Sequence, residues 1–262
     1  AADGSMRWEA QLSSEVAAQP VAAHGLVIAG SSDGQVYALD VNSGAVRWVQ
    51  ESSVPPLSLR GASRPLIGDG QVFVGQATGR LIAITTDTGE VAWETAIGIA
   101  EGRSEFERLV DIDADPVFAD GTIYAASYQA RLAALSMASG RILWSRDLST
   151  HLPLLLAGNV IYVSTAQSEV MAVDRANGTV LWRQGELAGR AITAPLLFNG
   201  MIAVGDNEGY LHFMSPEDGR FVGRVRVSES PILDAPQVAG DLLYVVDAGG
   251  ALQALRMAAS QP

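Results

Sequence analysis

The chain has 262 residues, and its apolar content of 48% is enough to bury a core in one large domain or two ordinary ones. Its formal net charge of −12 argues against a nucleic-acid-binding surface, because such surfaces depend on clustered Lys and Arg. With no cysteine, the chain can have no disulfides, thiolate nucleophiles or Cys-ligated metals. No apolar run is long enough to cross a bilayer and the N-terminus shows no signal pattern, so we expect a soluble chain.

A pattern of small residue, polar residue, Gly and Trp recurs with a period of about 40 residues, which is typical of a repeat architecture. Four complete copies span residues 38–48, 83–93, 134–144 and 172–182. A fifth copy, at 213–223, keeps the Gly but has Phe213 in place of the small residue and Gly223 in place of Trp. Only the end of a copy is present at 4–8, and only the beginning of one at 254–256.

Each repeat begins at a proline and contains three turn sequences that separate four short strands. The prolines are Pro20, Pro65, Pro116, Pro153, Pro195 and Pro236. The turns are rich in Gly, Asn and Asp, which tolerate the positive φ of tight hairpins. Between the turns lie β-branched and aromatic runs at 26–29, 72–74, 161–163 and 243–246. No segment shows a sustained helical period.

Repeated four-stranded antiparallel units predict an all-β fold, a β-propeller with tryptophan-docking repeats. We expect a single propeller domain over residues 1–262, with a partial blade at 1–10 and repeats that start near residues 20, 65, 116, 153, 195 and 236. The last repeat stops before its fourth strand, whereas residues 4–8 resemble a fourth strand without its first three. Either these ends pair and close a six-bladed ring, or the chain is an N-terminally incomplete part of a larger ring.

The tryptophans are expected to have a structural docking role, and they are Trp8, Trp48, Trp93, Trp144 and Trp182. We expect each indole ring to fill the gap between neighbouring blades, where the small residue leaves room. Strand alternation predicts that Val46 and Trp48 point to the same face. The exchange at Phe213 and Gly223 is interpreted as volume-conserving. A ligand-stacking cage is the disfavoured alternative, because one Trp per repeat would be spread around a ring.

Two consecutive connections between repeats are the longest: 17 residues from Trp48 to Pro65 and 23 from Trp93 to Pro116, against 9 to 13 elsewhere. Connections of this type emerge on one face of a propeller, so we expect these two to lie side by side on neighbouring blades. They combine apolar residues with Arg and paired carboxylates, which is typical of a protein-binding patch. A structural alternative stays open. In it the leucines enter the next blade, and Arg60 pairs internally with Asp111 or Asp113.

Other candidate chemistry is weak. His24, His151 and His212 occupy unrelated positions in their repeats, which indicates neither a metal cluster nor a catalytic base. The alternating acids from Asp111 to Asp115 lack the Gly and the distal Glu of an EF-hand loop. No nucleophile elbow, phosphate loop or dinucleotide fingerprint is present. We therefore expect no enzyme activity, no cofactor and no metal.

The repeat resembles the tryptophan-docking motif of quinoprotein alcohol dehydrogenases and of their non-enzymatic relatives. Among those relatives the whole chain is similar to the BamB family, lipoprotein subunits of the outer-membrane β-barrel assembly machinery. The stretches that carry this resemblance are 57–61, 108–113, 205–212 and 217–222. The resemblance implies an eight-bladed, non-catalytic scaffold that is anchored by lipid to the periplasmic face of the outer membrane. Because six repeats are present and the lipid-bearing Cys is absent, we expect a chain without its N-terminal portion.

The resemblance also implies a partner, a periplasmic POTRA domain of BamA, and nascent outer-membrane proteins are a further candidate. Carried over position by position, the contact residues are Leu57, Leu59, Arg60, Asp111 and Asp113. The rival hypothesis is a dehydrogenase that uses pyrroloquinoline quinone and calcium. The adjacent cysteine pair of that enzyme family cannot exist in this chain. A third hypothesis, that exposed strand edges receive unfolded outer-membrane proteins, is compatible with the scaffold and points to no particular residue.

Overall fold

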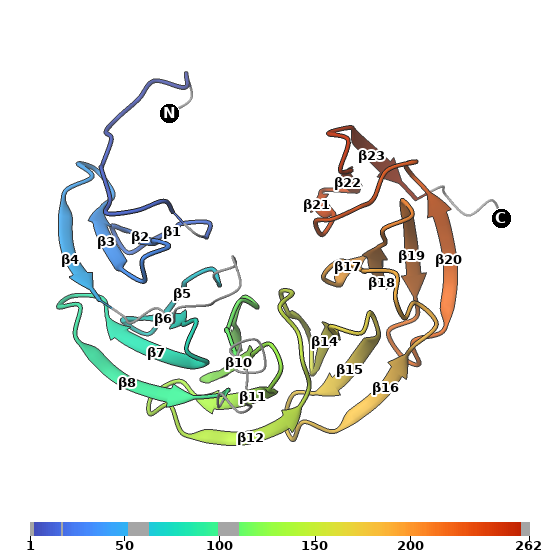
Figure 1. Cartoon of the computed structure of the whole chain (residues 1–262), viewed down its shortest axis with the longest axis horizontal. Helices are drawn as coiled ribbons and strands as arrows, with labels where there is room; N and C mark the ends of the chain where they lie inside the picture. The colour runs from blue at the N-terminus through green and yellow to red at the C-terminus, as the bar shows by residue number, and fades with distance from the viewer. Residues whose placement is uncertain (1–2, 17, 52–62, 99–109, 258–262) are drawn as a thin grey trace. The chain divides into compact units, whose positions relative to one another are not determined.

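The computed structural model describes residues 3–16, 18–51, 63–98 and 110–257, in which every regular element is a β-strand (Figure 1). The strands form six antiparallel sheets, five of four strands and one of three. Within each sheet, strands that follow one another in the chain are neighbours. The chain divides into two compact units, Ala1–His151 and Leu152–Pro262, with three sheets each. The predicted all-β class and four-stranded repeat unit are confirmed.

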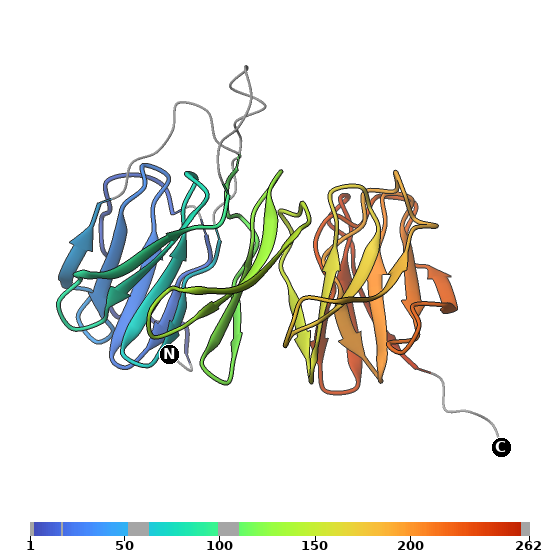
Figure 2. The ribbon, with the colours of Figure 1, turned by 90° about the horizontal axis from the view of Figure 1, so that it is seen from below.

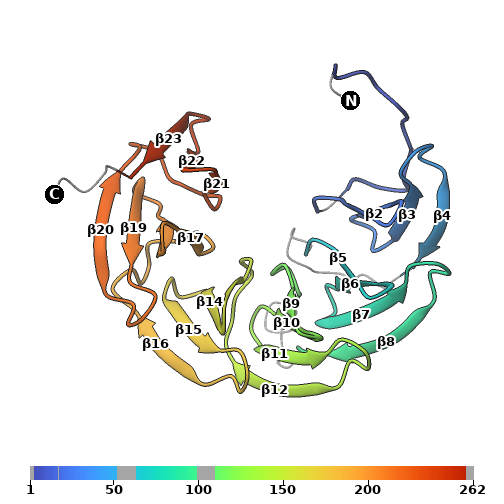
Figure 3. The same ribbon diagram turned by 180° about the vertical axis from the view of Figure 1, so that it is seen from behind.

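Unit 1 holds the first three sheets, whose strands run up and down between the turns at the two edges of the unit (Figure 2). The first sheet contains β1 (Val21–Ala23), β2 (Leu26–Gly30), β3 (Val36–Asp40) and β4 (Val46–Gln50). The second contains β5 (Leu66–Gly68), β6 (Gln71–Gly75), β7 (Arg80–Thr85) and β8 (Val91–Ala96). The third contains β9 (Val117–Ala119), β10 (Thr122–Ala126), β11 (Arg131–Ser136) and β12 (Ile142–Asp147). The fourth strand of each sheet lies at the outer rim of the unit (Figure 3).

Unit 2 holds the other three sheets. The fourth sheet contains β13 (Leu155–Ala157), β14 (Val160–Ser164), β15 (Val170–Asp174) and β16 (Val180–Gln184). The fifth contains β17 (Leu196–Phe198), β18 (Met201–Gly205), β19 (Tyr210–Met214) and β20 (Phe221–Arg226). The sixth contains β21 (Gln237–Ala239), β22 (Leu242–Val246) and β23 (Leu252–Arg256). Within this last sheet β23 pairs with β22.

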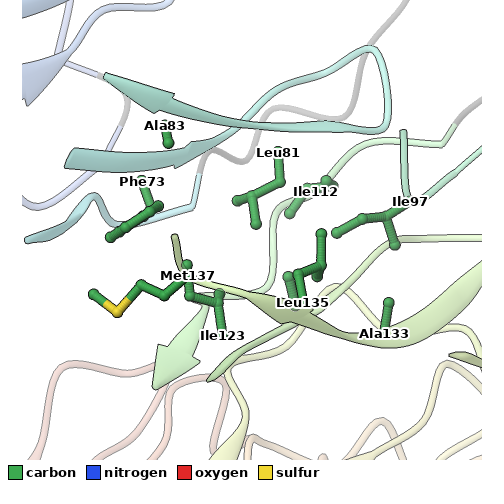
Figure 4. Packing of buried hydrophobic residues seen from close by; sticks show 10 residues of the cluster. Phe73, Leu81, Ala83, Ile97, Ile112, Ile123, Ala133, Leu135 and Met137 are labelled. Atoms are coloured by element: carbon green, nitrogen blue, oxygen red, sulfur yellow. The ribbon is translucent and has the colours of Figure 1, made fainter. Parts of the chain in front are cut away.

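The core of each unit lies between the faces of neighbouring sheets. Figure 4 shows one such layer in unit 1, where Phe73 and Leu81 of the second sheet meet Ile123 and Leu135 of the third. All four side chains are fully buried. Burying large apolar side chains on both faces of a sheet explains the nearly continuous apolar runs of the second and third strands. The sheets are thus held together mainly by apolar packing.

A β-bulge recurs between the third and fourth strands of the five complete sheets. In the first sheet Trp48 lies opposite Ala38, but Val46 lies opposite Leu39, so Arg47 is the extra residue. The prediction that Val46 and Trp48 share a face was therefore wrong, because a bulge shifts strand alternation by one residue. The exposures agree: the Val46 side chain is 51% exposed, and Trp48 is 8% exposed. The bulge is what turns the indole ring inward.

Indole rings join neighbouring sheets within each unit, and the ring of Trp8 joins the N-terminal segment to the first sheet. Four of them donate their N–H to a backbone carbonyl just after the third strand of a neighbouring sheet. These bonds run from Trp8 to Val41 (2.9 Å), Trp48 to Thr86 (2.6 Å), Trp93 to Met137 (3.0 Å) and Trp182 to Pro216 (2.8 Å). Trp144, in β12, lies opposite Ala134 and beside Tyr124, with 6.0 Å between the ring centroids. These rings combine apolar burial with a satisfied polar group.

The glycine of the repeat lies beneath the tryptophan of the preceding repeat. A β-carbon at Gly89 would stand 2.7 Å from the Trp48 ring, and one at Gly140 would stand 2.4 Å from the Trp93 ring. Both glycines also have positive φ. The Gly and Trp positions of the sequence pattern therefore contact each other across the sheet interface.

Gly219 of the fifth sheet lies beneath the Trp182 ring in the same way. The fifth sheet has no tryptophan of its own, and Phe213 and Gly223 face each other across β19 and β20. Phe213 packs against the core between the fifth and sixth sheets, as a volume exchange requires. A hollow of about 300 Å³ nevertheless remains beside Gly223. The exchange therefore conserves the volume only in part.

We expect Trp48→Ala to lower the free energy of unfolding by about 3–5 kcal/mol, because it leaves a cavity and an unpaired carbonyl at Thr86. Urea denaturation followed by circular dichroism measures the change. The matched control is Val46→Ala on the same strand, where an exposed side chain is lost and the change should stay within about 0.5 kcal/mol. Equal losses in both variants would contradict the docking role of the indole.

Candidate functional site

The two long connectors end next to each other in unit 1. The backbone N–H of Arg64, at the end of the first connector, donates to Asp115 Oδ1 of the second at 2.7 Å. Ser63 Oγ accepts a hydrogen bond from the N–H of Gly75 at 3.1 Å. A β-carbon at Gly75 would lie 2.7 Å from Ser63 Oγ and 2.4 Å from Ile112 Cγ2, so both connectors converge on this residue. The predicted adjacency of the connectors is confirmed for these described ends, residues 63–64 and 110–115, which we call the connector roots.

The second connector root is clamped between two sheets. The N–H of Ile112 donates to the carbonyl of Gln76, in the turn between β6 and β7, at 3.2 Å. On the other side, the N–H of Tyr128, in the turn between β10 and β11, donates to the carbonyl of Asp111 at 2.9 Å. Val110 and Ile112 are almost completely buried. The root therefore has a backbone conformation that is set by both of its neighbours.

Glycines at the end of β6 and in the turn between β6 and β7 create the space for this clamp. At Gly79, where φ is +73°, a β-carbon would stand 2.9 Å from Val110 Cγ2 and from the Val110 carbonyl. A side chain at Gly75 or Gly79 would push the connector root away from the sheet. The second turn of this repeat is consequently adapted to the connector that passes over it.

Carboxylates crowd together at the second connector root. Asp111 is fully buried, and Asp113 two residues later is partly buried. Burial, with a smaller contribution from the nearby charge of Asp111, raises the pKa of Asp113 to about 7. Burial also raises the pKa of Asp115, although the N–H and the charge of Arg64 oppose this shift. Ionising all the carboxylates of this cluster at once is therefore unfavourable, and a cation beside the cluster would make their ionisation easier.

The structure describes only two of the five predicted contact residues. Asp111 and Asp113 belong to the second connector root. Leu57, Leu59 and Arg60 lie outside the described residues, so the two alternatives for Arg60, a partner contact or an internal ion pair, remain predictions. Sequence reasoning missed Ser63 and the backbone of Arg64, because nothing in a sequence shows which backbone groups will meet across two connectors.

A second polar cluster lies in unit 2 around Asp206, which is fully buried. Its Oδ2 lies 2.8 Å from His212 Nε2 and 2.9 Å from Arg190 Nη1. Burial alone would raise the pKa of Asp206, but hydrogen bonds from His212 and from the backbone N–H groups of Tyr210 and Glu208 outweigh it and lower that pKa. The sequence indicated only that His212 was exposed or in the core. It is buried, and its partner Asp206 stands six residues earlier.

Two further features bear on function. Among residues 3–16, 18–51, 63–98 and 110–257, no group of three or more His, Asp or Glu side chains could hold a metal ion. The same part of the chain contains no helix long and apolar enough to span a membrane.

Comparison with known proteins agrees with the geometry. The sequence model of the family described as outer membrane protein assembly factor BamB matches residues 1–184 and 174–259. The outer membrane protein assembly factor BamB of Yersinia pestis is 37% identical over 252 residues, which is 96% of this chain and 64% of that protein. The chain therefore spans less than two thirds of this relative.

Solved structures show the same relationship. The crystal structure of BamB from Moraxella catarrhalis matches with a TM-score of 0.89 and 32% identity, covering 97% of this chain and 76% of that one. A quinohemoprotein alcohol dehydrogenase from Pseudomonas putida HK5 matches with a TM-score of 0.62 and 16% identity, covering 85% of this chain and 44% of that one, and shares the fold alone. The fold is thus that of a β-propeller, and the chain belongs to the BamB family of outer membrane protein assembly factors.

Proposed function

We propose that this chain is a non-catalytic scaffold of the outer-membrane β-barrel protein assembly complex and that it binds a POTRA domain of BamA through the two long connectors. The observation that carries the proposal is the hydrogen bond from the Arg64 N–H to Asp115, which ties the two connectors together on neighbouring sheets. Family membership supports the assembly role. A binding surface gains affinity when its loops are ordered before the partner arrives.

The roles within the proposed surface follow from residue chemistry. Leu57 and Leu59 supply apolar anchors, and Arg60 supplies a planar, charged contact. Asp111 and Asp113 orient Arg60 or meet a basic group of the partner. The backbone hydrogen bonds at Asp111 and Ile112 support this role, because they fix the part of the chain that carries the two carboxylates.

The proposed location is the periplasmic face of the outer membrane, where the resemblance to the BamB family implies attachment by lipid. There the scaffold assists the folding and insertion of outer-membrane proteins. The names of the relatives, outer membrane protein assembly factors, support association with that membrane.

Substitutions in the first connector test the partner surface. We expect Arg60→Ala and Leu57→Asp each to weaken binding of a purified POTRA domain of BamA by about tenfold or more, the usual effect of losing a hot-spot side chain. Calorimetric titration measures the binding, and thermal melts should show nearly unchanged stability. The matched control is Arg141→Ala, at an exposed arginine in the turn between β11 and β12. The proposal fails if both connector variants bind normally, or if both unfold.

The raised pKa of Asp113 predicts how stability depends on pH. Because the folded chain keeps this proton up to a pKa of about 7 and the unfolded chain releases it near 3.8, the folded state binds more protons between those values. The free energy of unfolding should therefore fall as pH rises from about 4 to about 7, and it should level off above. Asp113→Asn should remove this slope and stabilise the protein at pH 8 by about 1–2 kcal/mol, after allowance for screening at a partly exposed group. Urea denaturation at several pH values measures the slope, with Asp87→Asn, at an exposed carboxylate, as the control.

Titration with pyrroloquinoline quinone and calcium tests the absence of catalysis. The expected result is no saturable change in the absorbance of the quinone. Saturable binding at one equivalent would favour the dehydrogenase hypothesis.

A further inference from the structure

A hollow of about 480 Å³ lies in unit 2 beside β20. One wall is the segment 185–190, which follows β16, and the other wall is formed by β19 and β20 of the fifth sheet. His212 lines this hollow and Phe213 lines the smaller one described above, so the two hollows lie on opposite faces of the fifth sheet. A volume of this size is typical of small-molecule sites in proteins.

The segment wall is held in place by side-chain and backbone contacts. Arg190 Nη1 donates to Asp206 Oδ2 at 2.9 Å, and the backbone N–H of Asn207 donates to the carbonyl of Arg190 at 3.0 Å. Leu187, in the middle of the segment, is buried in the core between the fourth and fifth sheets. This wall therefore needs little ordering when a ligand binds, which favours affinity.

The strand wall is fixed as well, because both carboxylate oxygens of the buried Asp206 are hydrogen-bonded. Its Oδ2 lies 2.8 Å from His212 Nε2, and its Oδ1 accepts the backbone N–H groups of Glu208 and Tyr210, each at 2.9 Å. The centroid of the His212 ring lies 5.8 Å from that of the Phe221 ring. Both of these residues line the hollow, so aromatic side chains contribute to this wall.

Two charged side chains that line the hollow form no ion pair within the part of the chain that the structure describes. They are Glu186 on the segment wall and Arg224 on the strand wall, and both are exposed. The third charged residue of the lining, Arg190, is already paired with two carboxylates. The guanidinium carbon of Arg224 lies 5.3 Å from the centre of the Tyr210 ring, which holds it beside the hollow. The hollow thus offers one uncompensated charge of each sign, on different walls.

Apolar residues complete the lining. Leu187, Phe221 and Val222 all line the hollow, and Gly223 beside them has no side chain to fill it. A β-carbon at Gly223 would meet no atom within 4 Å. An apolar group of a ligand can therefore be accommodated here.

We propose that this hollow binds a free α-amino acid with an apolar side chain. The carboxylate of the ligand meets Arg224, its ammonium group meets Glu186, and its side chain packs against Leu187 and Phe221. A ligand with a single charge would use only one of the two charged groups. A small zwitterion with an apolar group matches both charges and the apolar lining together.

This site goes beyond the proposed scaffold function. It lies entirely in unit 2 and uses no connector residue, so either proposal can fail without the other. It also gives a role to the stretch 205–212, one of those that carry the family resemblance. Within that stretch Asp206, Glu208 and His212 hold the two walls in place.

The test is a titration of the full, isotope-labelled chain with phenylalanine, followed by two-dimensional NMR. We expect saturable shifts of the backbone signals of residues 186–190 and 221–224, and no shifts in the connector roots. Glycine, which lacks the apolar side chain, should bind at least tenfold more weakly. N-acetyl-phenylalanine lacks the ammonium charge and phenylalanine amide lacks the carboxylate, and each should bind at least threefold more weakly.

Two substitutions assign the charges to their partners. Arg224→Gln should abolish the preference for phenylalanine over its amide, and Glu186→Gln should abolish the preference over the N-acetyl compound. The matched control is Arg226→Gln, because Arg226 also lies over the Tyr210 ring, at 5.6 Å, but does not line the hollow. It should keep both preferences. All three positions are exposed, so the melting temperatures should not fall.

The proposal is overturned if phenylalanine produces no saturable shifts, or if the shifts map to other residues. It is also overturned if either charge substitution leaves the corresponding preference intact. Tighter binding of the dipeptide phenylalanyl-phenylalanine than of phenylalanine would contradict the assignment to a free amino acid.

Discussion

An indole ring packed on a glycine of the neighbouring sheet is the interaction on which the structure depends. The ring of Trp48 covers Gly89, and its N–H reaches the carbonyl of Thr86. The contact works only because a bulge turns the indole inward and because a glycine leaves room beneath it. Each interface of this kind joins two successive repeats, so neighbouring sheets hold each other in place.

The connector roots are fixed in place because they are hydrogen-bonded to these stable sheets. The end of the second connector is held by backbone hydrogen bonds to turns of two sheets. The first connector is held to the second through Asp115. Carboxylates whose ionisation is costly, mainly because they are buried and less because of their mutual repulsion, are thereby kept at one place. A cation beside them would lower that cost. A rigid base that carries an unbalanced charge is well suited to binding a protein with a basic surface.

The fifth sheet shows the effect of losing the tryptophan of one fourth strand. Without an indole, β20 keeps a hollow on each face and an arginine without a carboxylate partner among the described residues. A residue change that costs packing in a repeat protein leaves a local opening, while the remaining interfaces preserve the fold. The fifth sheet thus departs from the docking pattern at one strand while its fold stays the same as that of the other sheets.

The sequence by itself determined the blade architecture, because the spacing of Pro, Gly and Trp repeats the same turns and strands along the chain. It also identified the long connectors and the unusual residues Phe213 and Gly223. Only the tertiary structure decided that Val46 and Trp48 face apart, because a bulge is a property of strand pairing and not of one strand. Only it revealed the contact of Arg64 with Asp115 and of His212 with Asp206, because these groups meet through packing between elements that the sequence order does not relate. The repeated sequence pattern predicts the local geometry of turns and strands, whereas contacts between sheets depend on how the repeats pack against each other.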